Sequence, residues 1–171
     1  SSDLDVDCLG EKAKNIFYAG DTSLGYPTAL ACMKIIDSLN IDLDKKNIVV
    51  FGQGMLVGKP VKYLLEQRGL NVSTITRKTE NKEELFKSAD LIISATGQGK
   101  YITGDMIKEG SIIIDAGTSE SDSGIVGDVD LPSVKDIASY ISPVPGGVGP
   151  MTRAMLMKNT LLAYKHTIYK D

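Results

Sequence analysis

The sequence predicts a doubly wound α/β domain with a Rossmann-like parallel sheet. From residue 47 onward, short runs rich in Val and Ile alternate with segments of helical pattern, which is typical of βαβ units. The runs, such as "NIVVF" and "SIIID", are almost continuously apolar, as expected for strands that helices cover on both faces. The length of 171 residues suits one domain with a sizeable core.

Each element follows from its local pattern. The apolar runs predict strands over residues 47–52, 71–76, 90–97, 111–117 and 139–142. The segments between and after them predict helices over residues 57–69, 82–89, 130–138 and 151–167. Asp130 is a favourable N-cap for the short helix that follows it.

A further helix is predicted before the first strand, over "PTALACMKIIDSL" at residues 27–39. Pro27 is suited to a first helical position, and Leu30, Met33 and Ile36 fall on one stripe together with Ile35. Cys32 is expected to pack as a small core residue.

Residues 1–26 mix charges and glycines without a clear period. We therefore divide the chain into a connector at residues 1–26, which we interpret as the remnant of a preceding catalytic domain, and a single domain at residues 27–171. We expect Ile16, Phe17 and Tyr18 in the connector, together with part of the helix at residues 27–39, to form an exposed apolar surface.

Composition argues against several classes of function. The formal net charge is −3, with acids and bases interspersed, which predicts neither a nucleic-acid partner nor a membrane surface. The only Cys and His residues are Cys8, Cys32 and His166, so we expect no metal site and no disulfide framework. No apolar run reaches about 18 residues. We expect a cytoplasmic protein that binds small molecules.

The loop after the first strand has the composition of a phosphate-binding turn. Gly52, Gly54 and Gly58 lie where a parallel sheet binds dinucleotides, because glycine lets the backbone approach a pyrophosphate at the next helix N-terminus. The spacing departs from G-x-G-x-x-G, since Val57 stands where the third glycine belongs. A structural tight turn without a ligand is the alternative.

Three more loops place glycines at the same predicted edge of the sheet. Gly97 and Gly99 follow the third strand, and Gly117 follows the fourth. The segment "SPVPGGVGP" at residues 142–150 combines three prolines, which restrict the backbone, with three glycines, which leave space for a flat ligand. Here the alternative is a rigid helix entry.

The segment "SPVPGGVGPMTRAMLMKNTL" resembles the signature of the bifunctional methylenetetrahydrofolate dehydrogenase/methenyltetrahydrofolate cyclohydrolase family. "VGKP", "ITGDMIKEG", "IIIDAG" and "IVGDVD" resemble other motifs of that family in the same order, and the resemblance runs from about Asp5 to Tyr164. It implies that the proline and glycine loop lies beside the nicotinamide of a bound cofactor, with Gly146, Gly149 and Thr152 in contact.

The resemblance covers only the cofactor-binding part of the family. The preceding catalytic domain, whose Tyr-x-x-x-Lys motif supplies the acid–base lysine, has no counterpart in this sequence. Asp7 matches the aspartate that holds the pterin in the family's Asp-Val-Asp-Gly motif, although Cys8 replaces the glycine. Thr28 matches the threonine of a Pro-Cys-Thr-Pro motif whose flanking prolines are here Tyr26 and Ala29.

A second departure concerns the cofactor. Gln53 replaces the family's usual arginine, which contacts a 2′-phosphate. The second strand nevertheless ends in Arg77 and Lys78, without the acid that an NAD-selective site places about 20 residues after the glycines. We therefore predict NADP as the cofactor, with NAD as the alternative and a solvated basic turn as the interpretation without a ligand.

Taken with the resemblance, these observations predict fourteen cofactor-binding residues: Thr28, Gly52, Gln53, Gly54, Met55, Arg77, Lys78, Ala95, Thr96, Gly97, Thr118, Gly146, Gly149 and Thr152. Asp7 is predicted on the folate side. The implied activity is oxidation of 5,10-methylenetetrahydrofolate to 5,10-methenyltetrahydrofolate, followed by hydrolysis to 10-formyltetrahydrofolate. The implied intact protein is a homodimer, and this chain alone is expected to be inactive.

Two other interpretations stay open. One is a non-catalytic dinucleotide-binding module that acts with a separate partner domain, which the length of the natural reading frame would distinguish. The other is a different Rossmann dehydrogenase, such as a shikimate-type enzyme, which accounts for the glycine loops but leaves the loop at residues 142–150 unexplained.

Overall fold

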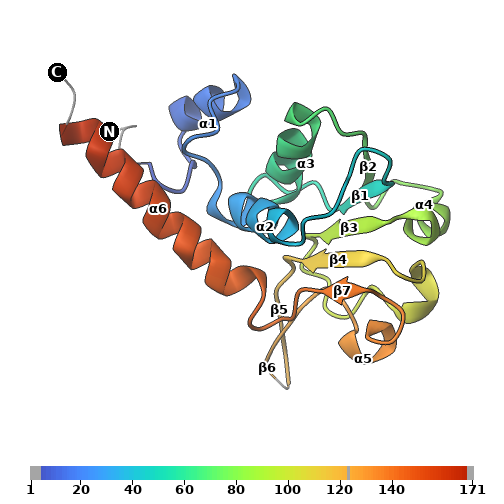
Figure 1. Cartoon of the computed structure of the whole chain (residues 1–171). Helices are drawn as coiled ribbons and strands as arrows, with labels where there is room; N and C mark the ends of the chain where they lie inside the picture. Colours follow the sequence, from blue (N-terminus) through green and yellow to red (C-terminus); the bar gives the residue numbers. More distant parts are fainter. Residues whose placement is uncertain (1–4, 123, 169–171) are drawn as a thin grey trace.

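The computed structural model describes residues 5–122 and 124–168, the last three of these by their backbone alone. Its centre is a five-stranded sheet (Figure 1). All of its strands pair in parallel, in the order β2-β1-β3-β4-β7, which confirms the predicted doubly wound architecture. The strands are β1 (Ile48–Phe51), β2 (Val72–Ile75), β3 (Leu91–Ser94), β4 (Ile112–Asp115) and β7 (Tyr140–Ile141).

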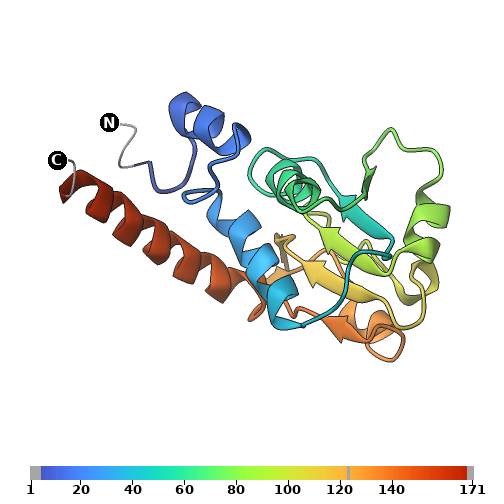
Figure 2. The ribbon, with the colours of Figure 1, turned by 45° about the horizontal axis from the view of Figure 1, so that its top comes forward.

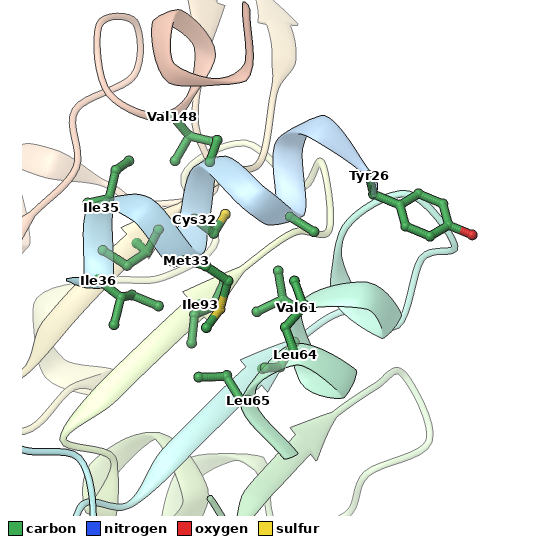
Figure 3. Close-up of a cluster of buried hydrophobic side chains, with 14 of the residues drawn as sticks. Tyr26, Cys32, Met33, Ile35, Ile36, Val61, Leu64, Leu65, Ile93 and Val148 are labelled. Carbon is green, nitrogen blue, oxygen red and sulfur yellow. The ribbon is translucent and has the colours of Figure 1, made fainter. Parts of the chain in front are cut away.

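Helices cover both faces of this sheet, and the strands divide their side chains between them. On one face, Ile48 and Val50 of β1 pack in a cluster with residues of α2 (Pro27–Ser38) and α3 (Gly58–Gln67). Figure 3 shows Ile93 of β3 in the same cluster, together with Met33 of α2 and Val61 of α3. On the other face, Val49 and Phe51 pack in a second cluster with α4 (Lys82–Ser88) and α5 (Leu131–Val134). This two-sided burial explains why β1 is apolar throughout and why β3 is apolar up to its last residue, Ser94.

The helix α2 forms as predicted over residues 27–38. The expectation that part of it is an exposed apolar surface was wrong, since all of its apolar side chains are buried or half-buried. Ala29, Ala31 and Cys32 are fully buried together with Met33 and Ile36, because α2 lies between the sheet and the last helix. Small residues allow that close approach on two sides. Cys32 is a core residue, as expected, and burial raises the pKa of its thiol to about 12.

The helix α6 (Val148–Ile168) packs on α2 with its first half and then runs past the sheet beside the N-terminal segment (Figures 1 and 2). It begins three residues before the predicted start, inside the glycine loop. Asn159 fixes its outer half: the side-chain amide is buried and donates to the carbonyl oxygens of Val6 at 2.8 Å and Gly25 at 2.7 Å. Within the described ranges, none of the helices is both long and apolar enough to cross a membrane.

The segment predicted as an irregular connector contains a helix, α1 (Glu11–Tyr18). Its Phe17 is fully buried rather than exposed, because its ring packs against the rings of Tyr18, Tyr26 and Tyr63 at centroid distances of 5.1–5.4 Å. Ile16 and Tyr18 are exposed, as expected. The sequence prediction was wrong here because the helix is short and a single aromatic side chain anchors it.

A two-stranded hairpin also lies outside the prediction. It consists of β5 (Ser119–Ser121) and β6 (Gly124–Val126), pairs in the antiparallel sense and projects from the end of β4 (Figure 1). Its strands are short and mostly exposed. The residues of β5 are polar, and β6 has the adjacent apolar residues Ile125 and Val126, so no alternating apolar pattern marked the hairpin.

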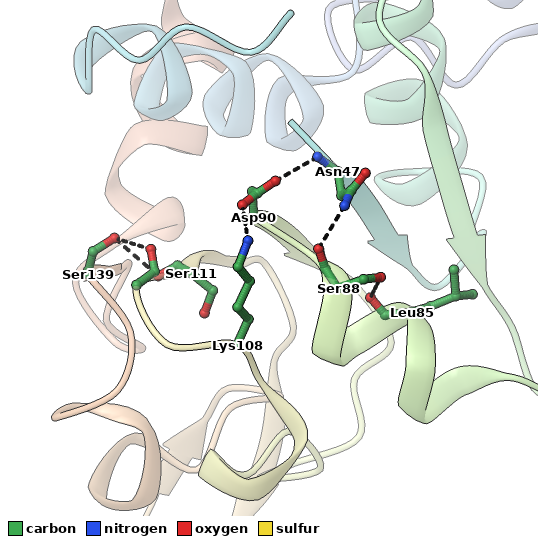
Figure 4. A network of polar contacts seen from close by, with 8 residues as sticks. Asn47, Leu85, Ser88, Asp90, Lys108, Ser111 and Ser139 are labelled. Atoms are coloured by element: carbon green, nitrogen blue, oxygen red, sulfur yellow. Dashed lines mark hydrogen bonds and ion pairs between the residues drawn. The ribbon is translucent and has the colours of Figure 1, made fainter. Parts of the chain in front are cut away.

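Polar contacts join the loops at the amino edge of the sheet (Figure 4). Asp90, just before β3, accepts the backbone N–H of Asn47 at 2.9 Å and pairs with the Lys108 ammonium at 2.6 Å. Lys108 and the Asn47 N–H together lower the pKa of the Asp90 carboxyl. The Ser139 hydroxyl before β7 donates to the carbonyl oxygen of Ser111 before β4. Side chains at this edge thus tie neighbouring strands together at their starts.

Candidate functional site

The carboxyl edge of the sheet carries the glycine loops that the sequence singled out. β1, β3 and β4 end at Phe51, Ser94 and Asp115, and β7 leads into the loop at residues 142–150. In a sheet of this order the connection changes direction between β1 and β3, where α/β proteins bind their ligands. The loops after β1 and β3 lie at this point.

The glycines of the first loop have different roles. A Cβ on Gly52, whose φ is +96°, would lie 2.6 Å from the Ala95 carbonyl oxygen, and a Cβ on Gly58 would overlap the Gly52 carbonyl oxygen. These two glycines are required by packing within the protein, and the place of Gly58 explains the irregular spacing. Gly54 faces open space, since a Cβ added there would meet no atom within 4 Å. Internal packing therefore does not explain Gly54, and a closely approaching ligand would.

A cavity of about 320 Å³, which we call the arginine cavity, opens beside this loop. Arg77 lines it from the turn after β2, and Ala95 and Thr96 line it from the end of β3. In the part of the chain that the structure describes, no carboxylate pairs with the Arg77 guanidinium. Gln53 also lines the cavity, and its amide donates to the carbonyl oxygen of Gly52 at 3.0 Å. The cavity thus holds an exposed, unpaired cation beside a glycine turn.

A larger cavity of about 730 Å³, the proline cavity, lies beside the ends of β4 and β7. Pro143, Pro145 and Pro150 line it together with Gly146 and Gly149. Gly146 has a φ of +109°, and its nearest neighbour would be 4.0 Å from an added Cβ; Gly149 has none within 4 Å. Like Gly54, these two glycines leave room for something other than protein, and the positive φ of Gly146 favours glycine there in addition.

Two threonines meet at the wall of the proline cavity. The Thr152 hydroxyl donates to the Val148 carbonyl oxygen at 3.0 Å and lies 3.4 Å from the Thr28 hydroxyl. α6 and α2 place these side chains, which come from sequence positions 124 residues apart. Asp115, at the end of β4, and Thr118 line the same cavity from the opposite loop.

Comparison with known proteins identifies this arrangement. Residues 26–168 match the family model described as "Tetrahydrofolate dehydrogenase/cyclohydrolase, NAD(P)-binding domain". The chain belongs to this family. It is 40% identical over 164 residues to the bifunctional protein FolD of Caldanaerobacter subterraneus, covering 96% of this chain and 59% of that protein. It is 44% identical over 141 residues to FolD of Natranaerobius thermophilus, covering 82% and 50%.

Solved structures of the tetrahydrofolate dehydrogenase/cyclohydrolase family share the fold. The chain matches FolD from Campylobacter jejuni with a TM-score of 0.88 and 41% identity, over 95% of this chain and 58% of that one. It matches the Trypanosoma brucei dehydrogenase-cyclohydrolase, solved as a complex with NADP and inhibitor, with a TM-score of 0.90 and 32% identity, over 99% and 61%. The chain therefore spans about half to three fifths of the length of these relatives.

The structure brings most of the predicted cofactor residues of this NAD(P)-binding domain to the two cavities. The arginine cavity includes Gly52, Gln53, Gly54, Arg77, Ala95 and Thr96. The proline cavity includes Thr28, Thr118, Gly146, Gly149 and Thr152. Met55, Lys78 and Gly97 line neither cavity, although each is one residue from a residue that does. The roles of all fourteen stay predictions.

The predicted folate-side residue lies away from both cavities. Asp7 is exposed in a turn of the N-terminal segment, next to Val6, whose carbonyl oxygen binds Asn159 on the outer half of α6. The following Cys8 is buried with a φ of +59°. This left-handed conformation favours glycine, which explains why the family's motif has glycine where this chain has Cys8.

Two buried carboxylates at the carboxyl edge were not among the predicted site residues. Asp115 accepts backbone N–H groups of Gly117 at 3.0 Å, Asp128 at 3.1 Å and Val129 at 3.0 Å. Burial raises the pKa of Asp115 to about 6, against the lowering effect of these hydrogen bonds. Asp128 is fully buried as well. Their signal in the sequence was an aspartate directly after an apolar strand and a second one beside a glycine, but neither pattern specifies a partner.

Proposed function

We propose that this chain binds NADP along the carboxyl edge of its sheet, as the cofactor-binding part of a methylenetetrahydrofolate dehydrogenase/methenyltetrahydrofolate cyclohydrolase. The observation that carries the proposal is the set of three glycines, Gly54, Gly146 and Gly149, that face open space along the two cavities. A side chain at any of them would occupy space that the protein itself does not use. The Trypanosoma brucei relative, solved with NADP, supports the choice of cofactor.

The residues present fit a phosphorylated dinucleotide. The pyrophosphate would lie against the loop at residues 52–54, near the N-terminus of α3, whose free N–H groups and dipole favour an anion. Arg77 would meet the 2′-phosphate in the arginine cavity, since a guanidinium offers paired donors to a dianion and no carboxylate competes for it within the described residues.

The proline cavity would hold the nicotinamide. When bound, the cofactor supplies hydride transfer. The contribution of the chain is to position it: the loop at residues 142–150 is restricted by three prolines, and the Gly147 N–H donates to the Pro143 carbonyl oxygen at 2.7 Å. Thr28 and Thr152 place two hydroxyl groups at the cavity wall. A loop that is ordered before binding loses little entropy when the ligand arrives.

Turnover of tetrahydrofolate derivatives is proposed for the whole protein, not for this chain alone. No Tyr-x-x-x-Lys motif occurs in the sequence, and positioned general acid–base groups contribute about 10²–10⁴ in rate. We therefore expect no dehydrogenase or cyclohydrolase turnover from residues 1–171 in steady-state assays, and robust activity would contradict this assignment. Asp7 is proposed as a folate-side residue of the complete site. A homodimeric whole protein in the cytoplasm completes the proposal.

Selective binding of NADP tests the cofactor assignment. We expect calorimetric titration of the wild type to give tighter binding of NADP than of NAD. The Arg77→Ala variant should lose about ten- to a hundredfold of NADP affinity, about 1.5–3 kcal/mol, because a charge-assisted hydrogen bond to the phosphate is lost. Its affinity for NAD should hardly change, since NAD has only a ribose hydroxyl at that place.

The matched control is Arg68→Ala. Arg68 is also an exposed arginine, but it follows α3 and pairs with Asp37 in the last turn of α2, at 2.6 Å and 3.2 Å. This variant removes the same charge and should leave both affinities unchanged. Equal losses of NADP and NAD affinity in Arg77→Ala, or a wild type that prefers NAD, would contradict a 2′-phosphate site at Arg77.

A further inference from the structure

The two buried carboxylates at the carboxyl edge are arranged reciprocally. A Cβ on Gly117, two residues after Asp115, would overlap the carboxyl group of Asp128. A Cβ on Gly127, next to Asp128, would overlap the carboxyl oxygen Oδ2 of Asp115. Each aspartate thus occupies the space that a glycine beside the other aspartate leaves free. Together they close the base of the hairpin β5–β6.

Asp128 also reaches the loop after β3. Its Oδ2 accepts the Ser94 hydroxyl at 2.6 Å, the Thr96 N–H at 2.8 Å and the Thr96 hydroxyl at 3.0 Å. Thr96 in turn accepts the Gln98 N–H at 3.2 Å through its hydroxyl. One buried carboxylate oxygen therefore determines where the chain runs from Ser94 to Gln98, which forms one wall of the arginine cavity.

Asp115 holds the other loop. Its Oδ1 accepts the Gly117 N–H, and its own N–H donates to the Ser142 hydroxyl at 2.8 Å, at the start of the proline loop. The loop at residues 115–118 forms a wall of the proline cavity. The carboxylate pair therefore lies between the walls of the two cavities, and no cation pairs with either carboxylate among the described residues.

From this geometry we infer that Asp128 and Asp115 are positioning residues for the cofactor: they hold the loops after β3 and β4 against each other and so set the spacing of the arginine and proline cavities. The inference rests on the proposed function, because it assumes that one dinucleotide occupies both cavities. In this arrangement Asp128 acts through the loops that it holds and does not contact the cofactor itself. A ligand that bridges two loops is bound tightly only when their separation is fixed beforehand.

The test compares two substitutions of Asp128 in the whole chain. Asp128→Ala removes the acceptor of three hydrogen bonds. Asp128→Asn keeps one oxygen for them and replaces Oδ1, which is buried without a hydrogen-bond partner in the described structure, by the amide nitrogen. We expect Asp128→Ala to weaken NADP binding about tenfold or more and Asp128→Asn to stay within about threefold of the wild type.

A second readout needs no cofactor. In the cofactor-free protein, amide hydrogen exchange at Thr96 should be about tenfold faster or more in Asp128→Ala than in the wild type, and close to the wild type in Asp128→Asn. Asp90→Ala is the matched control, since Asp90 ties loops at the opposite edge of the sheet. It should reduce thermal stability without changing exchange at Thr96 or the affinity for NADP.

The outcomes separate the inference from the function on which it rests. If the wild type binds NADP and Asp128→Ala binds it equally well, the inference is overturned and the proposed function stands. Equal weakening by Asp128→Ala and Asp90→Ala would also overturn it, because general destabilisation would then explain the loss. A wild type that does not bind NADP would contradict the proposed function itself.

Discussion

At both edges of the sheet, aspartate side chains join the loops of neighbouring strands, but their surroundings differ. At the amino edge, Asp90 is partly exposed, pairs with Lys108 and has a lowered pKa. At the carboxyl edge, Asp115 and Asp128 are buried without a cation among the described residues, and the pKa of Asp115 is raised to about 6. Both sets join loops of neighbouring strands. Desolvation is the main cause of the shift at Asp115 and a lesser one at Asp90, so burying the charge costs more at the carboxyl edge.

The unfavourable burial of carboxyl groups is thus concentrated at the carboxyl edge of the sheet. The amino-edge contacts use groups that water also reaches, so each contributes little and is easily replaced. The carboxyl-edge carboxylates are enclosed by backbone N–H groups, two glycines and the walls of the cavities. Unfavourable groups of this kind accumulate at functional sites, which is consistent with a ligand site at this edge.

Glycine substitutions should give the largest difference between the two edges in the free energy of unfolding. Gly117→Ala should lower the free energy of unfolding by about 3 kcal/mol, because the new Cβ overlaps the buried Asp128 carboxyl. At the amino edge, Gly110→Ala should cost only about 1–2 kcal/mol, because it strains a φ of +75° but meets no atom within 4 Å. Urea unfolding of both variants measures this. A cost for Gly117→Ala no larger than that for Gly110→Ala would show that the carboxylate packing is not rigid.

The dependence of stability on pH should have opposite sign at the two edges. The folded pKa of Asp115, about 6, lies above its ordinary value of 3.8, so the folded state holds the proton more tightly than the unfolded state does. The stability from this group is fully present below pH 3.8 and is lost as the pH rises through 6. Between pH 5 and 7.5 the wild type should lose about 1–1.5 kcal/mol relative to Asp115→Asn, as measured by urea unfolding at both pH values.

A flat difference between wild type and Asp115→Asn over that range would contradict a raised pKa. For Asp90 the sign is reversed, because its folded pKa is lowered. Its contribution is present above the ordinary carboxyl pKa and is lost only as the pH falls through the lowered folded value. Asp90→Asn should therefore show no change in its stability difference between pH 5 and 7.5.

The smallest effect is expected for the ion pair at the amino edge. Lys108→Ala should cost about 0.5–1 kcal/mol, because the ammonium is half exposed and salt screens the pair. Thermal unfolding in low and high salt measures both the loss and its screening. A loss above about 2 kcal/mol, insensitive to salt, would mean that the two edges are equally rigid.

The sequence predicted the strands and the long helices because burial on both faces leaves an unmistakable pattern. The five strands fall inside the predicted runs, and only their ends differ, where loop residues such as Gly52 and Gly97 had been included. It did not predict α1, which a single buried ring, Phe17, anchors, or the short, exposed hairpin β5–β6. The hairpin has no apolar period of its own, and α1 offers only one short set at helical spacing, Ala13, Ile16 and Phe17, so contacts distant in sequence determine both elements.

For the candidate site, glycine positions were informative and charge partners were not. Gly54, Gly146 and Gly149 could be singled out from their loops, and the structure shows that they face open space. Asp115 and Asp128 lie 13 residues apart in sequence, and their reciprocal packing on Gly127 and Gly117 appears only in three dimensions. A pattern in one dimension cannot show that two glycines exist to accommodate two carboxylates.

The most direct test of a cofactor site at the carboxyl edge is a titration of the wild type with NADP, followed through the backbone amide signals in two-dimensional NMR. We expect the signals of Gly54, Thr96, Gly146 and Gly149 to shift with one saturable binding curve. The amides of Asn47, Asp90, Ser111 and Ser139, at the amino edge, should stay in place. Shifts confined to the amino edge, or no saturable shift at the four carboxyl-edge amides, would contradict the account.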